Sequence, residues 1–554
     1  MRQIQKWVSD ELEFNARIRV NDIFEAEADL ILVHQETKKE YKIPMFWDGG
    51  FSWKARYVLT ELGAWDFTVK ESGELALGID GISGTVNCVE YEGDLDIYKH
   101  GFLKTEKDVR YFMYADGTPF FYLGDTHWNM VKEEFDSAGE AAGDIETDSH
   151  FKYIVDRRVE QGFTVYQSEP IGAKYNVDDG IISAEDIEGF KEFDKYFQYI
   201  AQKGLVHANA ELVFPSSVNH KEFRDNVKPL TRYWIARYAS YPVLWSLGQE
   251  VDDARNFAEG IYQTYRIMCE YISEIDPYKS PISAHQLNAQ AVGVDGNVPV
   301  APIDGGYNNY NPTQTERGGK TRPSTFKDVK GHTWWANQWR PVVDQQFNFG
   351  IPKDYWENGQ KKPVVDYEAR YHFLYGGSFC MRAQAWIGYM CFMGHAYGGA
   401  DMWLYRGRYA MDSDAFDGVE VTTVQKKRDT NWSDLINAPI SSELGYIKAF
   451  FESLEWWTLQ PDFDYEKAFV KTKDGNYACL YRGDEIYTVY LYNRTVDSAG
   501  KLINMDKNAT YTAKWYDTRT GKYSLISDSI KTNGEYDIPQ KPVADDMVLL
   551  VTKN

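Results

Sequence analysis

Two glutamates, Glu250 and Glu368, each follow a short apolar run of the kind that forms a buried strand. The first run is Tyr241-Pro-Val-Leu-Trp-Ser-Leu-Gly-Gln-Glu250, and the second is Lys362-Pro-Val-Val-Asp-Tyr-Glu368. Apolar runs of this length are typical of strands buried on both faces of a parallel sheet. Two facing carboxylates can divide the cleavage of a glycosidic bond between them, one as acid/base and one as nucleophile. A single glutamate after an apolar strand is usually a rim or capping residue, whereas the pair favours catalysis.

The spacing of the two glutamates predicts which strands they end. They lie 118 positions apart, which leaves room for roughly three βα units of about 30 to 40 residues each. We therefore expect Glu250 after the fourth strand and Glu368 after the seventh strand of a parallel barrel. Active sites of such barrels lie at the carboxyl ends of the strands.

The middle of the chain has the pattern of an α/β protein, because segments typical of apolar strands alternate with segments typical of helices from Gly101 onward. We predict a (β/α)8 TIM barrel. Its strands are expected at 120–128, 163–169, 205–211, 241–250, 281–285, 333–339 and 362–368, with the eighth near 401–403. Residues 288–331 are rich in Gly, Asn and Pro and are expected to form a long loop over the site.

Alternating polar and apolar residues on both sides of the barrel predict antiparallel β-sandwich domains. The predicted domains are an N-terminal Ig-like β-sandwich at 1–98, the barrel at 99–456 and a C-terminal β-sandwich at 457–554. The N-terminal segment holds no convergent catalytic set, so we expect it to pack on the barrel and shape one rim of the site. An independent sugar-binding module is the alternative.

Polar and aromatic residues at the other predicted strand ends could hydrogen-bond or stack on one sugar ring. These substrate-binding candidates are Asp125, His127, Trp128, Gln167, Glu169, Asn209, Glu211, His285, Trp335, Tyr367, His395 and Tyr397. For each one alone, a structural role is the competing interpretation. Asp125 and His127 could be taken for metal ligands, but no tight ligand spacing accompanies them, so we expect neither a metal nor another cofactor. The motifs of serine hydrolases and of nucleotide-binding loops are lacking.

Composition narrows the class of ligand. The formal net charge is −23 and the sequence pI is near 5.0, which argues against nucleic acid or an anionic membrane as a partner. Aromatic residues make up 16% of the chain, with 17 Trp and 40 Tyr, and their flat faces suit sugar rings. A neutral oligosaccharide or glycoside is the expected partner; the oligomeric state stays open.

Five cysteines at scattered spacing, Cys88, Cys269, Cys380, Cys391 and Cys479, predict reduced core residues rather than disulfides or a zinc site. The first residues lack the apolar run of a signal peptide, and no stretch approaches the length of a membrane-spanning helix. The expected location is cytoplasmic, although a chain with a trimmed leader would have the same sequence.

Several motifs resemble the apiosidase-like glycoside hydrolases, the group around glycoside hydrolase family 140. They are Asp116-Gly-Thr-Pro-Phe-Phe-Tyr-Leu-Gly-Asp-Thr-His-Trp128, Trp245-Ser-Leu-Gly248, Pro363-Val-Val-Asp-Tyr-Glu368 and Gly394-His-Ala-Tyr-Gly398. The stretch from Phe46 to Trp65 resembles the small sandwich often found before that barrel, and Trp515–Gly521 resembles the sandwich that follows it. The resemblance implies a retaining enzyme, with the strand-four carboxylate as acid/base and the strand-seven glutamate as nucleophile.

One departure from the family pattern bears on the substrate. The family often carries Asp after a Gly-Gly pair at strand four, whereas this chain has Gly248-Gln-Glu250. The sugar therefore stays open among apiose, arabinofuranose and a pyranose. The leading hypothesis is a retaining, exo-acting glycoside hydrolase that removes a terminal neutral sugar from oligosaccharides or plant glycosides. The alternatives are an endo-acting polysaccharide hydrolase and a non-catalytic carbohydrate-binding barrel.

Overall fold

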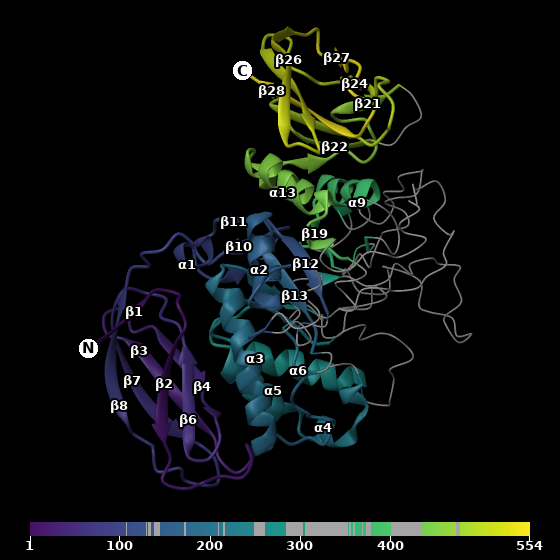
Figure 1. The fold of residues 1–554 in the computed structure, drawn as a ribbon. Coiled ribbons are helices and arrows are strands. Elements are labelled where there is room, and N and C mark those ends of the chain that lie inside the picture. The colour runs from purple at the N-terminus through teal and green to yellow at the C-terminus, as the bar shows by residue number, and fades with distance from the viewer. Residues whose placement is uncertain are drawn as a thin grey trace, which may run out of the picture.

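A curled parallel sheet of eight strands lies between two β-sheet units in the computed structural model (Figure 1), and it confirms the predicted α/β barrel with flanking β domains. The structure describes residues 1–106, 108–128, 130, 135–137, 145–170, 173–208, 210–213, 216–248, 261–283, 303–304, 353, 356–357, 361–367, 369, 371–372, 378–399, 435–472 and 477–554.

The order of the barrel strands is that of a (β/α)8 fold. In chain order they are β12 (Leu123–His127), β13 (Val165–Ser168), β14 (Val206–Ala208), β15 (Val243–Ser246), β16 (Ile282–Ser283), β17 (Ile303–Asp304), β18 (Val365–Asp366) and β19 (Gly394–Tyr397). In space they lie in the order β16-β15-β14-β13-β12-β19-β18-β17, and every neighbouring pair is parallel. The first strand thus lies beside the last, as barrel closure requires. β15 and β18 are the fourth and seventh strands, as predicted.

The prediction for strand six was wrong. The sixth position is taken by β17, which pairs with β18 through Ile303 opposite Val365, and not by 333–339, which lies outside the described residues. In the sequence, Ile303 follows Pro302 and precedes Asp304-Gly-Gly306, inside a segment rich in glycine and asparagine. A strand of only two residues does not require a long apolar run, so the composition of this segment predicted a loop.

Strand eight also differs from the prediction. It is β19, which pairs with β12 and β18, whereas we expected it near 401–403, outside the described residues. His395 and Tyr397 are 2% and 1% exposed, so this strand is buried despite its polar atoms. Those polar atoms made the segment look like a loop that leads to a strand.

Helices separate the barrel strands and cover the sheet. They are α1 (Asp96–Lys99), α2 (His150–Glu160), α3 (Ala184–Gln202), α4 (Lys221–Asp225), α5 (Val227–Tyr238), α6 (Ile261–Ile275), α9 (Ser378–Met390) and α13 (Pro439–Glu452). Ser149 caps α2 by accepting from Lys152 N, as its position predicts. Ser183 and Asp186 form a capping box on α3.

A small antiparallel sheet closes the amino-terminal end of the barrel. Its strands are β9 (Leu103–Lys104), β10 (Phe112–Tyr114) and β11 (Pro119–Phe120). Phe112 and Phe120 belong to one apolar cluster with the barrel residues Val165, Val206 and Val365. This plug leaves the carboxyl ends of the strands as the place for a site.

The N-terminal unit packs two sheets. Its strands are β1 (Arg2–Gln5), β2 (Asp10–Asn15), β3 (Ala28–His34), β4 (Glu40–Pro44), β5 (Phe46–Trp47), β6 (Ser52–Tyr57), β7 (Gly63–Glu71) and β8 (Ser83–Val89). The sheets have the orders β1-β8-β7-β3-β4 and β2-β6-β5. All pairs are antiparallel except β1 and β8 at the edge of the larger sheet, which run parallel, so the predicted antiparallel β fold of this unit is confirmed.

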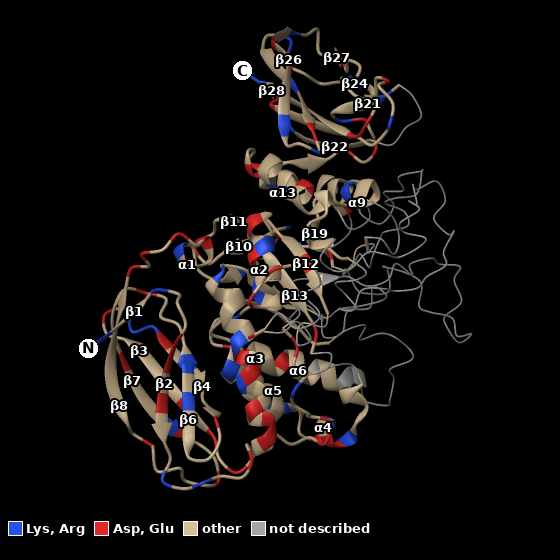
Figure 2. Ribbon diagram, in the orientation of Figure 1, with Lys and Arg blue, Asp and Glu red and all other residues tan. Residues whose placement is uncertain are grey.

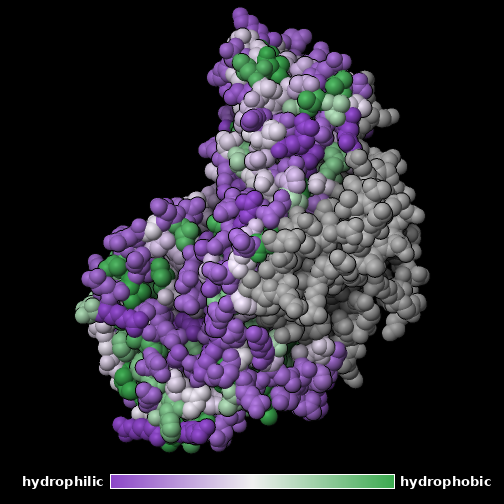
Figure 3. Space-filling model, viewed as in Figure 1, coloured by the Kyte–Doolittle hydropathy of each residue, from purple (hydrophilic) through white to green (hydrophobic). Residues whose placement is uncertain are grey.

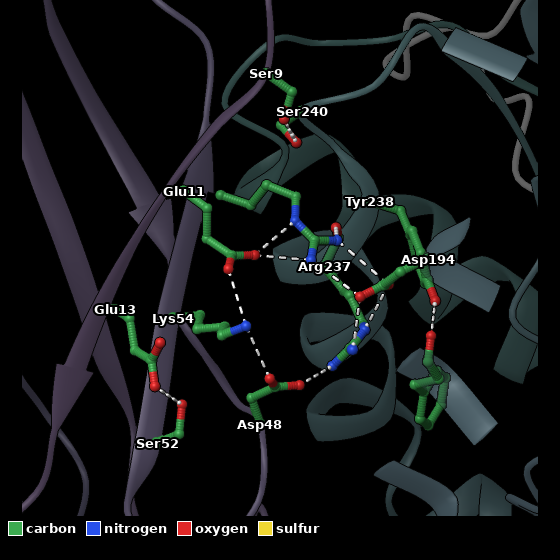
Figure 4. A network of polar contacts seen from close by, with 12 residues as sticks. Ser9, Glu11, Glu13, Asp48, Ser52, Lys54, Asp194, Arg237, Tyr238 and Ser240 are labelled. Atoms are coloured by element: carbon green, nitrogen blue, oxygen red, sulfur yellow. Dashed lines mark hydrogen bonds and ion pairs between the residues drawn. The ribbon is translucent and has the colours of Figure 1, made fainter. Parts of the chain in front are cut away.

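A network of charged side chains joins this unit to the barrel helices (Figure 4), and Figure 2 marks charged residues on β2 and β6 of the unit and on α3 of the barrel. Arg237 of α5 is fully buried and pairs with Asp48 at 3.0 Å and with Asp194 of α3 at 2.7 Å. Arg56 of β6 pairs with Glu11 at 2.8 Å and with the same Asp194 at 3.0 Å. The unit therefore packs on α3 and α5, as expected; whether it also shapes the rim of the site stays a prediction.

The C-terminal unit is a second pair of sheets, placed over α9 and α13 (Figure 1). Its strands are β20 (Gln460–Pro461), β21 (Phe469–Lys471), β22 (Tyr477–Arg482), β23 (Ile486–Leu491), β24 (Gly500–Leu502), β25 (Thr510–Asp517), β26 (Lys522–Lys531), β27 (Tyr536–Asp537) and β28 (Met547–Lys553). The orders are β20-β22-β23-β28-β25-β26 and β21-β24-β27. Arg382 of α9 anchors it through Asp546, with Nε 3.0 Å from Oδ2.

All five cysteines are buried, which confirms the prediction of core residues. The described surface facing the viewer in Figure 3 is mainly hydrophilic, with small hydrophobic groups on both β units. None of the helices in the described ranges is long and apolar enough to cross a bilayer.

Candidate functional site

Gln167 lies at the centre of the polar groups inside the barrel. It is fully buried near the end of β13 and donates from Nε2 to the Tyr367 carbonyl at 3.0 Å and to Thr126 Oγ1 at 3.3 Å. Its Oε1 accepts from the Tyr122 hydroxyl at 2.8 Å. One amide thus ties β13 to β12 on one side and, across the barrel, to the residue that follows β18.

Two aromatic candidates, Trp128 and Tyr367, lie inside the barrel. Both belong to the cluster that holds Val365 and Leu244, and their ring centroids are 6.3 Å apart. The Trp128 indole donates to the Tyr371 hydroxyl at 2.6 Å. The structure therefore brings Trp128, Gln167 and Tyr367 together at the carboxyl ends of three strands.

Two carboxylates, Glu169 and Glu211, lie close enough to Tyr367 to affect its ionisation. Burial raises the pKa of the Tyr367 phenol well above its ordinary value, and the charges of Glu211 and Glu169 raise it further. Both glutamates are only 2% exposed. The Tyr367 phenol is thus neutral and lies near two carboxylates, so its hydroxyl is suited to donating a hydrogen bond.

The backbone on both sides of Glu211 is fixed by aromatic side chains. The Trp234 indole of α5 donates to the Ala210 carbonyl at 3.2 Å, and the Tyr175 hydroxyl donates to the Leu212 carbonyl at 2.9 Å. Trp234 and Tyr175 also pack on each other, with ring centroids 6.2 Å apart. The structure therefore holds Glu211 in place through its neighbours, a feature that the sequence motif did not reveal.

Asp125 and His127 lie on the other face of β12, between the sheet and α2. Asp125 Oδ2 is 2.5 Å from His127 Nε2 and also accepts from Nε of Arg158. Burial would raise the pKa of Asp125, but the charges of Arg158 and His127 outweigh it and hold the pKa below its ordinary value. Both residues are at most 1% exposed. This packing supports a structural role for the pair, and their contact with substrate stays an untested prediction.

His395 and Tyr397 face the same outer layer on β19. Tyr397 is paired with His372, whose Nδ1 lies 2.9 Å from the Tyr397 hydroxyl oxygen. His395 Nδ1 lies 3.6 Å from Asp366 Oδ2. These two residues therefore lie on the helix-facing side of β19 and do not join Gln167 and Tyr367 inside the barrel.

Five predicted site residues lie outside the described residues: Asn209, Glu250, His285, Trp335 and Glu368. Their roles stay predictions. The sequence reasoning missed Tyr122, Thr126 and Tyr371, which contact the interior candidates directly. Tyr122 and Thr126 stand two positions to either side of Gly124, so the period of two along a strand could have found them.

An apolar hollow in the described part of the chain lies at the opposite end of the barrel. It encloses about 450 Å³, including solvent at its mouth, and is lined by Phe121, Val364, Phe392 and Trp456 among others. Phe121, Val364 and Phe392 come just before β12, β18 and β19, so they lie at the amino-terminal ends of these strands, opposite the candidate site. We therefore do not assign it to the active site.

The ligand types that hold metals do not converge in the described part of the chain, where no group of three or more His, Cys, Asp or Glu could bind an ion. His207 instead packs beside Ser168, with Nε2 2.6 Å from Ser168 Oγ. His372 also lies beside a hydroxyl group, with Nδ1 2.9 Å from the Tyr397 hydroxyl oxygen.

His207 makes stability depend on pH. Burial lowers its pKa to about 3, against about 6.5 in an unfolded chain. The unfolded state alone binds a proton between these values, so the free energy of unfolding falls as the pH drops below about 6.5. We expect His207→Gln to reduce the loss of stability between pH 7 and pH 5 by about 2 kcal/mol. Urea unfolding at both pH values measures it, and an equal loss in wild type and variant would contradict it.

Comparison with known proteins places the chain in a family. Residues 106–458 match the catalytic domain of the apiosidase-like family, and residues 3–72 match a domain of unknown function, DUF5060. Among curated proteins, none matches the chain.

Solved structures share the fold. A protein of Bacteroides vulgatus ATCC 8482 solved as a candidate glycoside hydrolase is 16% identical, with a TM-score of 0.65 and full coverage of both chains. A glycoside hydrolase family 5 protein of the same organism is 18% identical, with a TM-score of 0.56, and the alignment covers 82% of this chain and 94% of that one. Since the catalytic-domain match spans more than half of the sequence, the chain belongs to the apiosidase-like family of glycoside hydrolases.

Proposed function

We propose that this glycoside hydrolase acts by retention, with Glu368 as nucleophile and Glu250 as acid/base. One observation carries the proposal: β15 and β18 occupy the fourth and seventh positions of the barrel. In the sequence, Glu250 follows Ser246 by four residues and Glu368 follows Asp366 by two. Both glutamates therefore come after the carboxyl ends of their strands, where barrel enzymes carry their chemistry.

The groups around these strand ends favour a neutral sugar. Glu169 and Glu211 add two buried carboxylates near Tyr367, and their charges would repel a uronic acid. Carboxylates and a phenol can instead bond to the hydroxyls of a neutral ring, while Trp128 offers an aromatic face. Apiose, arabinofuranose and a pyranose all meet this description.

The reaction takes two displacements. The Glu368 carboxylate attacks the anomeric carbon while the glycosidic C–O bond breaks, and Glu250 gives its proton to the departing oxygen. Glu250 then takes a proton from water, whose oxygen attacks the same carbon and releases Glu368. Two inversions leave the anomeric configuration unchanged.

We propose that the enzyme acts on chain ends, as an exo-hydrolase. Single sugars released from an oligosaccharide from the first minutes onward would support this. A ladder of oligosaccharides would show endo action instead.

Removal of the acid/base separates its role from that of the nucleophile. With aryl furanosides and pyranosides of both anomers, we expect Glu250→Ala to cleave an activated aryl glycoside but to stall at the second step. Azide needs no general base, so it should restore turnover and yield a glycosyl azide of retained configuration. Lack of rescue, or an inverted azide, would contradict the assigned role.

A further inference from the structure

The end of β18 is held from both faces just before Glu368. On the inner face, Gln167 Nε2 donates to the Tyr367 carbonyl at 3.0 Å. On the outer face, Gln384 Nε2 of α9 donates to Asp366 Oδ2 at 3.0 Å. These contacts fix two consecutive residues from opposite sides, and the predicted nucleophile is the next residue in the sequence.

Asp366 is an energetically unfavourable residue for its buried position at the end of β18. It is 1% exposed, accepts a hydrogen bond from the Gln384 amide, and has His395 Nδ1 3.6 Å from its Oδ2. Its second oxygen, Oδ1, has no hydrogen-bond partner in the described part of the chain. A buried carboxylate without a full counter-charge destabilises a fold. An amide or an apolar residue would fill the position at lower cost, which indicates a use for the charge.

Helix α9 holds Gln384 rigidly. Every residue from Cys380 to Met390 is buried. Arg382 pairs with Glu443 of α13 at 2.8 Å and with Asp546 of the C-terminal unit. Tyr389 donates to the Tyr122 carbonyl at 2.7 Å, where β12 begins. The amide that meets Asp366 therefore comes from a helix that is fixed to both the C-terminal unit and the first strand.

We propose that Asp366, held by the Gln384 amide, is a positioning residue for Glu368. It fixes the end of the seventh strand, and its negative charge acts on the catalytic carboxyl groups. This inference rests on the proposed function. Among the described residues, the titratable groups that face Asp366 are His395 of β19 and Tyr389 of α9.

Two variants separate position from charge. Gln384→Met removes the donor but keeps the volume and the charge of Asp366, so the strand end loses its outer contact. We expect kcat to fall about tenfold with KM unchanged within about twofold. Asn226→Leu is the matched control, since Asn226 is a partly buried amide between α4 and α5, away from α9, that donates to the Gly180 carbonyl at 3.2 Å. It should lower the melting temperature to a similar degree and leave kcat unchanged.

Asp366→Asn removes the charge and keeps the shape, and the Gln384 amide can turn to bond with the new amide. A nearby negative charge raises the pKa of another carboxyl group. Its loss should therefore move the acid limb of the kcat/KM profile to lower pH, by about half a unit or more. A role confined to packing would not move this limb.

The outcomes distinguish this inference from the function on which it rests. If Gln384→Met loses no more kcat than Asn226→Leu, and Asp366→Asn leaves the acid limb in place, Asp366 is only an anchor for α9. In that case the positioning role is refuted while the hydrolase stands. If wild type cleaves no glycoside, or Glu368→Gln stays active, both are refuted.

Discussion

Replacing Glu368 with Gln is expected to lower kcat on an aryl glycoside by about 10⁴-fold or more while the fold persists. The amide has the size of the carboxylate but cannot attack the anomeric carbon, so the first displacement fails. Initial rates measure the loss, and circular dichroism with the melting temperature reports on the fold.

Glu160→Gln is the matched control for this change. Glu160 ends α2 with 65% of its side chain exposed, so the same chemical replacement there should leave the rate unaltered. A Glu368→Gln enzyme that kept a rate near that of wild type would show that the seventh strand does not carry the nucleophile.

Replacing Arg237 with Met is expected to cost about 3 to 5 kcal/mol of unfolding free energy. Arg237 is fully buried, and its guanidinium pairs with Asp48 and Asp194 and donates a hydrogen bond to the Tyr233 hydroxyl. Removal of this cation leaves Asp48 with Lys54 as its counter-charge (Figure 4) and Asp194 with Arg56, so each largely buried carboxylate loses one of two cations. Urea unfolding at pH 7 measures the loss.

The pH dependence of this loss identifies its cause. Burial would raise the pKa of Asp194, but Arg56 and Arg237 outweigh it and hold the pKa below its ordinary value. The stability from that pairing is complete above about pH 4 and disappears as the pH falls through the folded-state pKa. The difference between Arg237→Met and wild type should therefore shrink in acid.

A control for this variant is Lys448→Met, which removes a pair exposed to solvent on α13, with Nζ 2.7 Å from Glu452. Exposed pairs contribute well under about 1 kcal/mol. A loss for Arg237→Met as small as that of the control would mean that the network does not hold the N-terminal unit to the barrel.

Much of the barrel was predictable because parallel strands buried on both faces leave apolar runs. The fourth strand is an example, since Val243–Ser246 lies inside the predicted 241–250. Strands six and eight were missed because one has two residues and the other carries buried polar side chains.

The candidate site was predictable only in part, because the sequence shows where a strand ends but not which face each residue takes. Successive side chains point to opposite faces of a sheet, so a shift of one position exchanges the interior for the helix layer. In β12 the interior contact comes from Thr126, whereas the predicted Asp125 meets Arg158 outside. The partners that decide such cases, Arg158 and Gln384, lie on helices that no strand motif reveals.

The most direct test of Glu368 as the nucleophile is to trap the covalent glycosyl-enzyme. A 2-deoxy-2-fluoro glycoside of the sugar that the enzyme cleaves slows release of the covalent intermediate, so peptide mapping by mass spectrometry can locate the label. We predict one label per chain, on Glu368, and none in Glu368→Gln. A label on Glu169, Glu211 or Glu250, or an unlabelled enzyme whose product has inverted configuration, would contradict the proposed mechanism.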